Sequence, residues 1–267
     1  MKPILRFIFL VISVFIIVNC ARTGRPEGGP KDENPPLFVT ANPPYKTINF
    51  DDKEIKLNFN EFIKLKNINK QLIVSPPLKN PLLISPQGSA SKSLTLKILD
   101  TLKDNNTYII NFGNAIEDNN EGNSLESFKY VFSTGTYIDS LSVSGEIKDA
   151  YLNQSPKSTN ILLYKIDSSF NDSIVYNKLP QYVTNTLDST TTFNLENLKA
   201  GKYMLLAIKD ANEDNKFQQK TDKIGFYKEF ITIPTDSSFT LKLFKEENDF
   251  NIVRPRLISG EKIAFGY

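Results

Sequence analysis

The chain has 267 residues, with 32 basic and 30 acidic side chains, one cysteine, and neither histidine nor tryptophan. The absence of histidine excludes Ser-His-Asp and Cys-His catalysis and the usual imidazole zinc sites, so we do not expect an enzyme. One cysteine cannot form a disulfide within the chain. The near-zero net charge argues against nucleic acid as a partner.

The first twenty residues have the pattern of an export signal. Lys2 and Arg6 precede an apolar run over residues 7–18. As a helix, this run spans about 18 Å, well short of a ~30 Å hydrocarbon core. A charged start, a short apolar centre and a sharp end predict a signal peptide over residues 1–19 rather than a membrane span. Its removal leaves 30 basic and 30 acidic residues.

Cys20 stands directly after this segment. Ile17-Val18-Asn19-Cys20 resembles the lipobox of bacterial lipoproteins, although Asn19 stands where Gly, Ala or Ser is usual. The resemblance implies acylation of the Cys20 sulfur and of its new amino group, and several acyl chains anchor stably. Ala21 in place of Asp implies, by the sorting rules of that class, the outer membrane. The alternative is a buried thiol that happens to end a hydrophobic helix.

Residues 20–35 are rich in Gly, Pro and charge, which predicts a flexible tether. Beyond the tether, short alternating or β-branched runs recur between Asn, Asp, Pro and Gly clusters, which indicates an all-β protein. The runs expected to form strands in the first half are 55–59, 72–74, 82–84, 94–98, 107–112 and 128–132. About seven strands over ~100 residues predict a β-sandwich.

The ends of this first unit carry specific motifs. Pro35-Pro36 opens into an apolar run, and Tyr130 to Gly135 reads Tyr-Val-Phe-Ser-Thr-Gly after the loop 116–123. Residues 36–136 thereby resemble the S-layer-type bacterial Ig-like domain, whose last strand ends in Phe-x-Thr after an Asp-x-x-Gly-Asn turn. Here one extra residue separates Asp118 from Gly122-Asn123. The resemblance implies a fold and not an activity.

The loop of this motif is acidic, with Asp118, Glu121, Asn123 and Glu126 close together in the sequence. Paired carboxylates can perform general acid–base chemistry, as in glycosidases. Nothing else in the sequence builds a cleft around them, so we expect a solvated turn without a catalytic role.

A second unit begins near residue 141. A Gly-x-Ile strand start at 145–147, a buried-looking run at 161–164 and a Leu-x-x-Leu-x-x-Gly-x-Tyr turn at 195–203 are its main signals. Residues 141–245 thereby resemble the prealbumin-like, carboxypeptidase-regulatory-type sandwich. The five-residue junction 136–140 predicts two sandwiches stacked end to end with limited hinging.

The C-terminal extension, residues 246–267, starts polar and ends in a strand-like run. A lone strand is not stable by itself. We therefore expect this run either to pair with the second sandwich or to begin a further domain of a longer chain.

One cluster has the spacing of a calcium loop. Oxygen-bearing side chains at its first, third and fifth positions converge on a hard cation, with a backbone carbonyl at the seventh. The proposed ligands are Asp210, Asn212, Asp214, the carbonyl of Lys216, and Asp222. Asn215 replaces the usual turn-forming Gly, and Asp222 lies one residue beyond the usual twelfth position. The alternative is a polar hairpin loop whose Asp and Asn side chains cap their own backbone; if calcium binds, we expect it to be weak and structural.

These patterns support one leading interpretation and one alternative. The leading interpretation is a noncatalytic, lipid-anchored envelope protein that uses its sandwiches as spacer and protein-interaction modules. The alternative is a surface accessory lipoprotein that captures polysaccharide or peptide through a flat patch of exposed Tyr and Phe. The expected partners are the membrane, through the lipid anchor, and an envelope protein or extracellular ligand.

Overall fold

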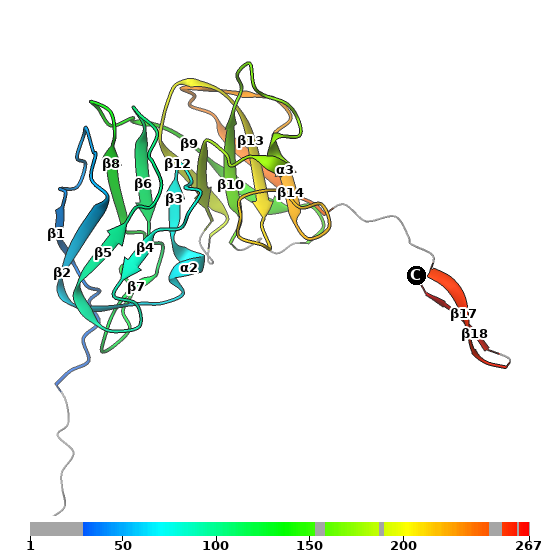
Figure 1. Ribbon diagram of the computed structural model, residues 1–267, viewed down its shortest axis with the longest axis horizontal. Helices are drawn as coiled ribbons and strands as arrows, with labels where there is room; N and C mark the ends of the chain where they lie inside the picture. The colour runs from blue at the N-terminus through cyan, green and yellow to red at the C-terminus, as the bar shows by residue number, and fades with distance from the viewer. Residues whose placement is uncertain (1–28, 153–157, 187–189, 246–252, 261, 267) are drawn as a thin grey trace, which may run out of the picture. The chain divides into compact units, whose positions relative to one another are not determined.

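The computed structural model describes residues 29–152, 158–186, 190–245, 253–260 and 262–266. Strands dominate these residues, so the predicted all-β class is confirmed (Figure 1). The described helices are single turns, α2 (Ile68–Gln71) and α3 (Ile174–Asn177). Neither is a candidate for crossing a membrane.

The first sandwich consists of two sheets. Sheet 1 has the order β1-β2-β5-β4, with β7 also pairing to β2, and sheet 2 has the order β3-β6-β8. Every pairing within them is antiparallel. The strands are β1 (Phe38–Asn42), β2 (Glu54–Leu65), β3 (Ile73–Ser75), β4 (Leu83–Ser85), β5 (Ser91–Lys97), β6 (Thr107–Asn111), β7 (Ile116–Asp118) and β8 (Lys129–Ser133).

The core of this sandwich follows the alternation of its strands. In β2, Ile55, Leu57 and Phe59 are buried while the residues between them are more exposed, as expected where one sheet face meets water. The core also holds stacked aromatic rings, with Tyr108 and Phe132 5.4 Å apart between ring centroids. The predicted strands of the first half are therefore confirmed, and β7 is a strand that the sequence pattern did not predict.

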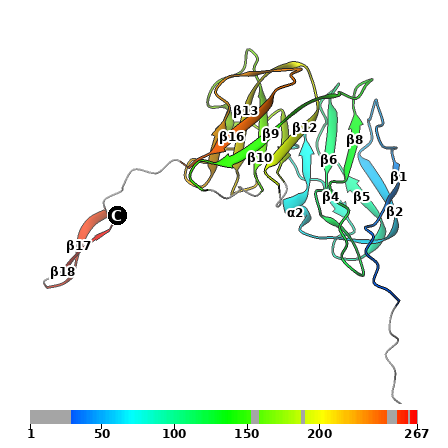
Figure 2. The same ribbon diagram turned by 180° about the vertical axis from the view of Figure 1, so that it is seen from behind.

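The second sandwich also has two sheets (Figure 2). Sheet 3 has the order β12-β9-β16, and sheet 4 has the order β11-β10-β13-β14, with β15 also pairing to β13. The β9–β16 pair is parallel, and the other pairs are antiparallel. The strands are β9 (Leu141–Asp149), β10 (Asn160–Lys165), β11 (Tyr182–Asn185), β12 (Thr192–Leu198), β13 (Gly201–Lys209), β14 (Lys223–Phe226), β15 (Ile231–Ile233) and β16 (Ser238–Leu243).

Strand β14 connects the two sheets of the second sandwich. Ile224 and Phe244 exchange two backbone hydrogen bonds of 2.8 Å, so the end of β16 lies beside β14. Gly225 permits this approach, because a Cβ at this position would come within 2.7 Å of the Lys242 carbonyl oxygen. The two sheets of the second sandwich are thereby joined by backbone hydrogen bonds where β14 lies beside the end of β16.

Sheet 2 is buried on both faces, and its outer face belongs to the contact between the sandwiches. Tyr108 and Ile110 of β6 point into the first core, whereas Ile109 lies opposite Val131 on the other face. Both Ile109 and Val131 are buried. Ile109 lines a small cavity together with Val183 of β11 and Leu195 of β12. The second sandwich therefore covers sheet 2 with two of its edge strands, and the expected end-to-end stack is wrong.

Polar contacts cross the same boundary. The Val183 N–H donates to Ser75 Oγ at 3.1 Å, and Lys129 Nζ lies 2.6 Å from Glu196 Oε2. The Lys199 ammonium donates to the carbonyl of Asn105. These bonds pair polar groups at the rim of an apolar contact. Because hydrogen bonds are directional, they fix the relative orientation of the two sandwiches.

The junction between the sandwiches is itself held in place. Asp139 is buried; its N–H donates to Thr107 Oγ1, and the Thr107 hydroxyl donates to Asp139 Oδ2, both at 2.8 Å. Asn197 Nδ2 donates to the Asp139 carbonyl oxygen at 2.6 Å. The junction thus bonds to both sandwiches, and the limited hinging expected from its length stays a prediction.

The C-terminal strand pairs with a strand that the sequence pattern did not predict. β17 (Val253–Ser259) and β18 (Lys262–Gly266) form a two-stranded antiparallel sheet of their own. Among the described residues, neither strand pairs with the second sandwich.

The buried outer face of sheet 2 leads to a first prediction. Val131→Asp places a charge between the sandwiches without touching the first core, and burying an unpaired charge is strongly unfavourable. We expect calorimetry to show two separate unfolding transitions in place of one cooperative transition. Thr40→Asp, on the exposed face of sheet 1, is the control. A single transition at the parent midpoint in Val131→Asp contradicts the coupling.

Candidate functional site

The acidic loop closes the end of β7, and its first carboxylate is the centre of the loop. Asp118 is 1% exposed. Its Oδ1 accepts the N–H groups of Glu121 at 2.6 Å and Gly122 at 3.0 Å, and its Oδ2 accepts that of Asn123 at 2.8 Å. Gly122 has φ 82°, which suits glycine. The expectation of a solvated turn is wrong for Asp118, because backbone N–H groups satisfy this carboxylate in place of water.

These bonds determine the charge state of Asp118. Burial disfavours the ionised carboxyl, but the N–H groups of Glu121, Asn123 and Gly122 outweigh burial and lower the pKa of Asp118 to about 2. A carboxylate with this pKa stays ionised at neutral pH and has no proton to give. Its geometry suits it to holding a loop.

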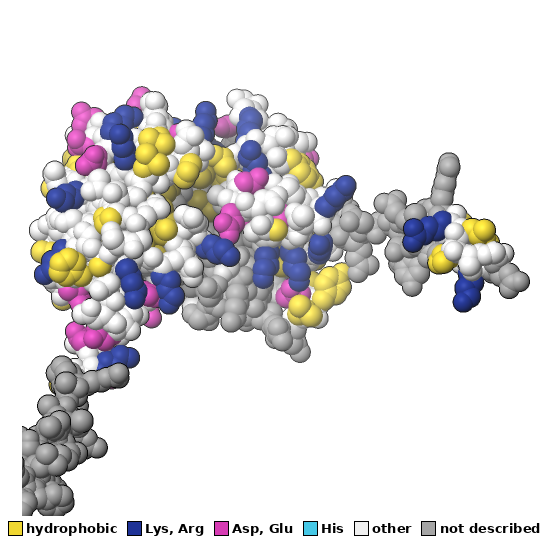
Figure 3. Space-filling model, turned by 60° about the horizontal axis from the view of Figure 1, so that its bottom comes forward, with side chains coloured by type: hydrophobic (Ala, Val, Ile, Leu, Met, Phe, Trp, Pro, Cys, Tyr) yellow, Lys and Arg dark blue, Asp and Glu magenta, His cyan; other side chains and the backbone are white. Residues whose placement is uncertain are grey.

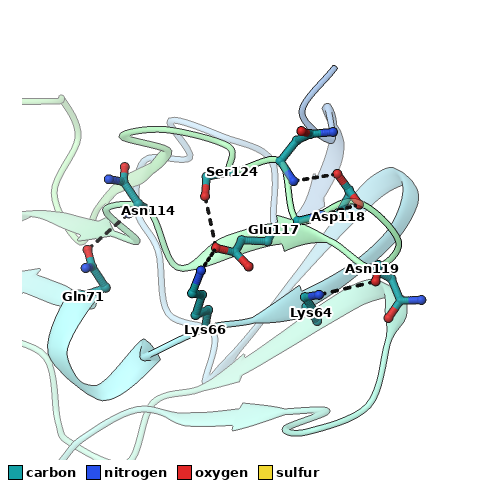
Figure 4. Close-up of polar contacts among 10 residues, drawn as sticks. Lys64, Lys66, Gln71, Asn114, Glu117, Asp118, Asn119 and Ser124 are labelled. Carbon is teal, nitrogen blue, oxygen red and sulfur yellow. Dashed lines mark hydrogen bonds and ion pairs between the residues drawn. The ribbon is translucent and has the colours of Figure 1, made fainter. Parts of the chain in front are cut away.

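Glu117, the preceding residue, is also buried and is paired with a lysine (Figure 4). Lys66 Nζ lies 2.8 Å from Glu117 Oε1, and the Ser124 hydroxyl donates to the same oxygen at 3.3 Å. Figure 4 shows Lys64 of β2 beside Asn119. The Lys64 ammonium donates a hydrogen bond to the backbone carbonyl oxygen of Asn119, with 3.4 Å between Nζ and the oxygen. The sequence analysis did not select Glu117 or Lys66, because a single charged residue within or directly after a short strand resembles an ordinary exposed position.

The family comparison agrees with this geometry. Residues 32–134 match the family described as bacterial Ig-like domain. The first sandwich is a bacterial Ig-like domain. The acidic loop lies before the last strand of this Ig-like domain, where the sequence motif places it.

Two solved structures are similar to the chain at low identity. The N-terminal part of the bacterial S-layer protein SbsC is 14% identical, with 80% of this chain and 44% of that chain covered and a TM-score of 0.26. The major pilin subunit BcpA of Bacillus cereus is 11% identical, with 79% of this chain and 71% of that chain covered and a TM-score of 0.24. The chain therefore spans less than half of the S-layer fragment that it matches. No curated protein matches the chain significantly.

The proposed calcium ligands outside the Ig-like domain lie in the loop between β13 and β14. Asp210 Oδ1 accepts the N–H groups of Asn212 at 3.0 Å and Glu213 at 2.8 Å, and Oδ2 accepts that of Asn215 at 2.6 Å. Asn215 has φ 57°, the left-handed conformation expected where calcium loops usually carry glycine. Asp210 therefore caps the backbone of its own loop, as the alternative interpretation expects.

The carboxylates of the other proposed ligands, Asp214 and Asp222, also accept hydrogen bonds from neighbouring residues of the loop. Asp214 accepts the Lys216 N–H at 2.9 Å and the side-chain amide of Gln218 at 2.9 Å. Asp222 is buried and accepts the N–H groups of Ala211 and Gln218 at 3.0 and 2.8 Å. Among the described residues, no group of three or more His, Cys, Asp or Glu side chains is arranged to hold a metal ion. Calcium binding stays a prediction: Asp210 Oδ1 already accepts two N–H groups, whereas Asp210 Oδ2 accepts one and keeps a lone pair for a cation.

Electrostatics of the loop favour an added cation. Burial raises the pKa of Asp210, and the negative charge of Asp214 raises it further, against the opposing effect of the backbone hydrogen bonds. Burial also raises the pKa of Tyr164, and the charges of Asp214 and Asp210 add to the rise. The side-chain oxygen Oε1 of Gln218 is buried without a hydrogen-bond partner next to this loop. A bound cation is expected to relieve the repulsion between the two carboxylates.

The proposed lipidation site, Cys20, lies outside the described residues. The signal segment 1–19 and the first part of the tether lie outside them as well.

The capping role of Asp118 leads to a second prediction. In Asp118→Asn one carboxylate oxygen becomes an NH2 group that cannot accept an N–H, and the remaining amide oxygen is uncharged, so we expect a loss of about 1–3 kcal/mol of unfolding free energy at pH 7. The folded pKa of about 2 lies below the ordinary value of 3.8, so the stabilisation is present above pH 4 and is lost as the pH falls through about 2.

Urea unfolding between pH 7 and pH 2 measures both effects. The parent should lose more stability than Asp118→Asn below pH 4, since the variant lacks the titrating group. Asp236→Asn, at an exposed aspartate, is the control. Equal acid sensitivity of the parent and Asp118→Asn contradicts the role of the carboxylate.

The loop between β13 and β14 leads to a third prediction. Calcium at about ten times a millimolar Kd should raise the melting temperature by about 3–6 °C, and Asp210→Asn with Asp214→Asn should remove the rise. Asp167→Asn is the matched control, because Asp167 also caps its own backbone, with Oδ1 accepting the Ser169 N–H at 2.8 Å. A parent melting temperature independent of calcium contradicts the site and leaves self-capping as the role of the loop.

Proposed function

We propose that the chain is a noncatalytic, lipid-anchored envelope protein whose two sandwiches act together as one spacer and protein-interaction module. The observation that carries this proposal is the double burial of sheet 2, which joins the Ig-like domain to the second sandwich. Ile109 and Val131 are buried on the outer face of this sheet, and the junction residue Asp139 bonds to Thr107. Hydrogen bonds at the junction hold the two sandwiches in a fixed relative orientation. A spacer requires this rigidity to keep one end at a set distance from the other.

The interaction part of the proposal rests on a sheet edge. β1 is an end strand of sheet 1 and pairs with β2 on one side. Leu37 and Val39 at this edge are exposed, and the register shift between Phe38 and Thr40 places a bulge at Val39. Exposed edges accept a partner strand through backbone hydrogen bonds, and bulges limit such pairing to the remaining length of the strand. We therefore place a partner strand along the Thr40–Asn42 end of β1.

The anchor part of the proposal rests on the sequence. The lipobox-like segment 17–20 supports acylation of Cys20, and the Gly- and Pro-rich residues 20–35 support a tether between the membrane and β1. Ala21 supports the outer membrane as the final location. The face that Figure 3 displays carries basic and acidic side chains interspersed, which does not favour nucleic acid as a partner.

The alternative, capture of polysaccharide or peptide, has one observation in its favour. Phe226 of β14 and Phe230, which directly precedes β15, are exposed aromatic side chains of the kind that this alternative requires. Protease treatment of intact cells, followed by detection of residues 141–245 before and after lysis, separates the two functions. Cleavage in intact cells favours capture at the surface, whereas protection until lysis favours a spacer that faces the periplasm.

The lipid anchor leads to a fourth prediction. Cys20→Ala removes the acylated sulfur, so labelled fatty acid should no longer be incorporated and the protein should leave the membrane fraction. Asn19→Gly, which restores the usual residue before the cysteine, is the matched control and should keep both properties. Membrane retention of Cys20→Ala at the parent level contradicts the anchor.

A further inference from the structure

The hairpin formed by β17 and β18 has two chemically different faces. Leu257 lies directly opposite Ile263, so these side chains share a face, and Arg256 and Lys262 are next to them in sequence and point to the other face. Ile258, 65% exposed, lies at the register shift between Leu257 and Ser259. Leu257 is 67% exposed and Ile263 is 57% exposed. Alternation of apolar and charged residues is typical of strands that bury one face and keep the other in water. The apolar face of this hairpin is therefore built to be covered.

A two-stranded hairpin is marginally stable by itself in water. The described residues add no third strand to β17 or β18. A stable hairpin thus requires a surface of matching chemistry, and the second sandwich offers one.

That surface is the outer face of sheet 4. Phe226 is paired with Leu206, and both lie on the face opposite the core between sheets 3 and 4. Part of this face is covered by α3 and by Phe217, which belong to the same small cluster. Phe226, 55% exposed, and Phe230, 44% exposed, lie beyond this cover.

The remaining part of the face combines apolar side chains with one lysine. Met204 lies next to Leu206 on the same face of β13, and Lys202, two residues further, has its ammonium 5.4 Å from the centroid of the Phe230 ring. Phe170 packs edge to face against Phe230 at 5.5 Å. We call Phe170, Met204, Phe226 and Phe230 the aromatic surface.

The chain leaves the second sandwich beside this surface. Ile224 of β14 bonds to Phe244, and the rings of Phe226 and Phe244 have centroids 6.0 Å apart. Eight residues of sequence, 245–252, connect Phe244 to Val253. Nine Cα steps span at most about 31 Å, whereas a four-stranded sheet is about 14 Å wide from first to last strand. The hairpin can therefore reach any part of the aromatic surface of its own chain.

We propose that the β17–β18 hairpin docks on the aromatic surface of its own chain, with Leu257 and Ile263 against Phe226 and Phe230. Arg256 and Lys262 then face water, as their charges require. The docked hairpin extends the small cluster under α3 across the whole outer face of sheet 4, and it gives the C-terminal region a defined place on the second sandwich. This contact does not depend on the lipid anchor or on the spacer function.

Cross-linking tests the contact directly in the mature chain, residues 20–267, with Cys20→Ser. Lys202→Cys with Ser259→Cys places thiols beside the aromatic surface and on the hairpin, and leaves Leu257, Ile263, Phe226 and Phe230 intact. Lys92→Cys with Ser259→Cys is the matched control, because Lys92 lies 5.5 Å from the ring centroid of another exposed phenylalanine, Phe62. With a short bismaleimide, the first pair should give a cross-linked monomer at least about tenfold faster than the control pair, as expected for a large difference in effective concentration.

Hydrogen exchange gives a second readout that does not need new cysteines. In the parent, backbone amides of 253–259 and 262–266 should exchange at least about tenfold more slowly than in Leu257→Ser with Ile263→Ser. Arg256→Ser with Lys262→Ser alters the other face of the same hairpin and should keep the protection.

Three results overturn the proposal. Equal cross-linking of the two cysteine pairs shows that the hairpin does not prefer the aromatic surface. A cross-linked dimer shows that a second chain supplies the hairpin. Protection of the hairpin that appears only with phosphatidylglycerol vesicles shows that a lipid surface covers its apolar face.

Discussion

The architecture depends on sheet 2, which is buried on both faces: one face packs in the core of the Ig-like domain and the other contacts the second sandwich. The strands of sheet 2 present Tyr108, Ile110 and Tyr130 to the core of the Ig-like domain, and present Ile109 and Val131 to the second sandwich. An antiparallel sheet that faces water on one side alternates polar with apolar residues. These strands do not, so the Ig-like domain is incomplete without a cover for its outer face. The bonded junction at Asp139 and the contact of Ser75 with Val183 follow from that need.

The two acidic loops share the same hydrogen-bonding pattern, but the pKa of the central carboxyl group shifts in opposite directions. In each, one carboxylate accepts three backbone N–H groups and thereby shapes a turn. At Asp118 these bonds outweigh burial, and the pKa falls. At Asp210 burial and the nearby charge of Asp214 outweigh the bonds, and the pKa rises. The first loop is thus complete without a ligand, whereas the second keeps a repulsion that a cation can remove.

Three features of the described surface bear on the proposals: the β1 edge, the aromatic surface and the apolar face of the hairpin. The last two match each other in chemistry and lie within reach along the chain, whereas pairing at β1 needs a strand from outside the chain. β1 begins a few residues after the proposed tether, so under the proposed lipid anchor a partner strand on β1 would bind at the membrane-proximal end of the two sandwiches.

The sequence alone determined the all-β class, most strands of the first sandwich and its Ig-like domain, because two-residue alternation and turn chemistry are local properties. The left-handed conformation of Asn215 came from the structure, although asparagine is one of the few residues that tolerate it. The tertiary structure alone decided that Asp118 is buried, because its N–H donors come from a turn whose depth depends on packing. It also decided that edge strands cover sheet 2 and that β17 pairs with β18. Such contacts join residues far apart in the chain, and an apolar residue such as Val131 does not reveal from sequence which of two surfaces will bury it.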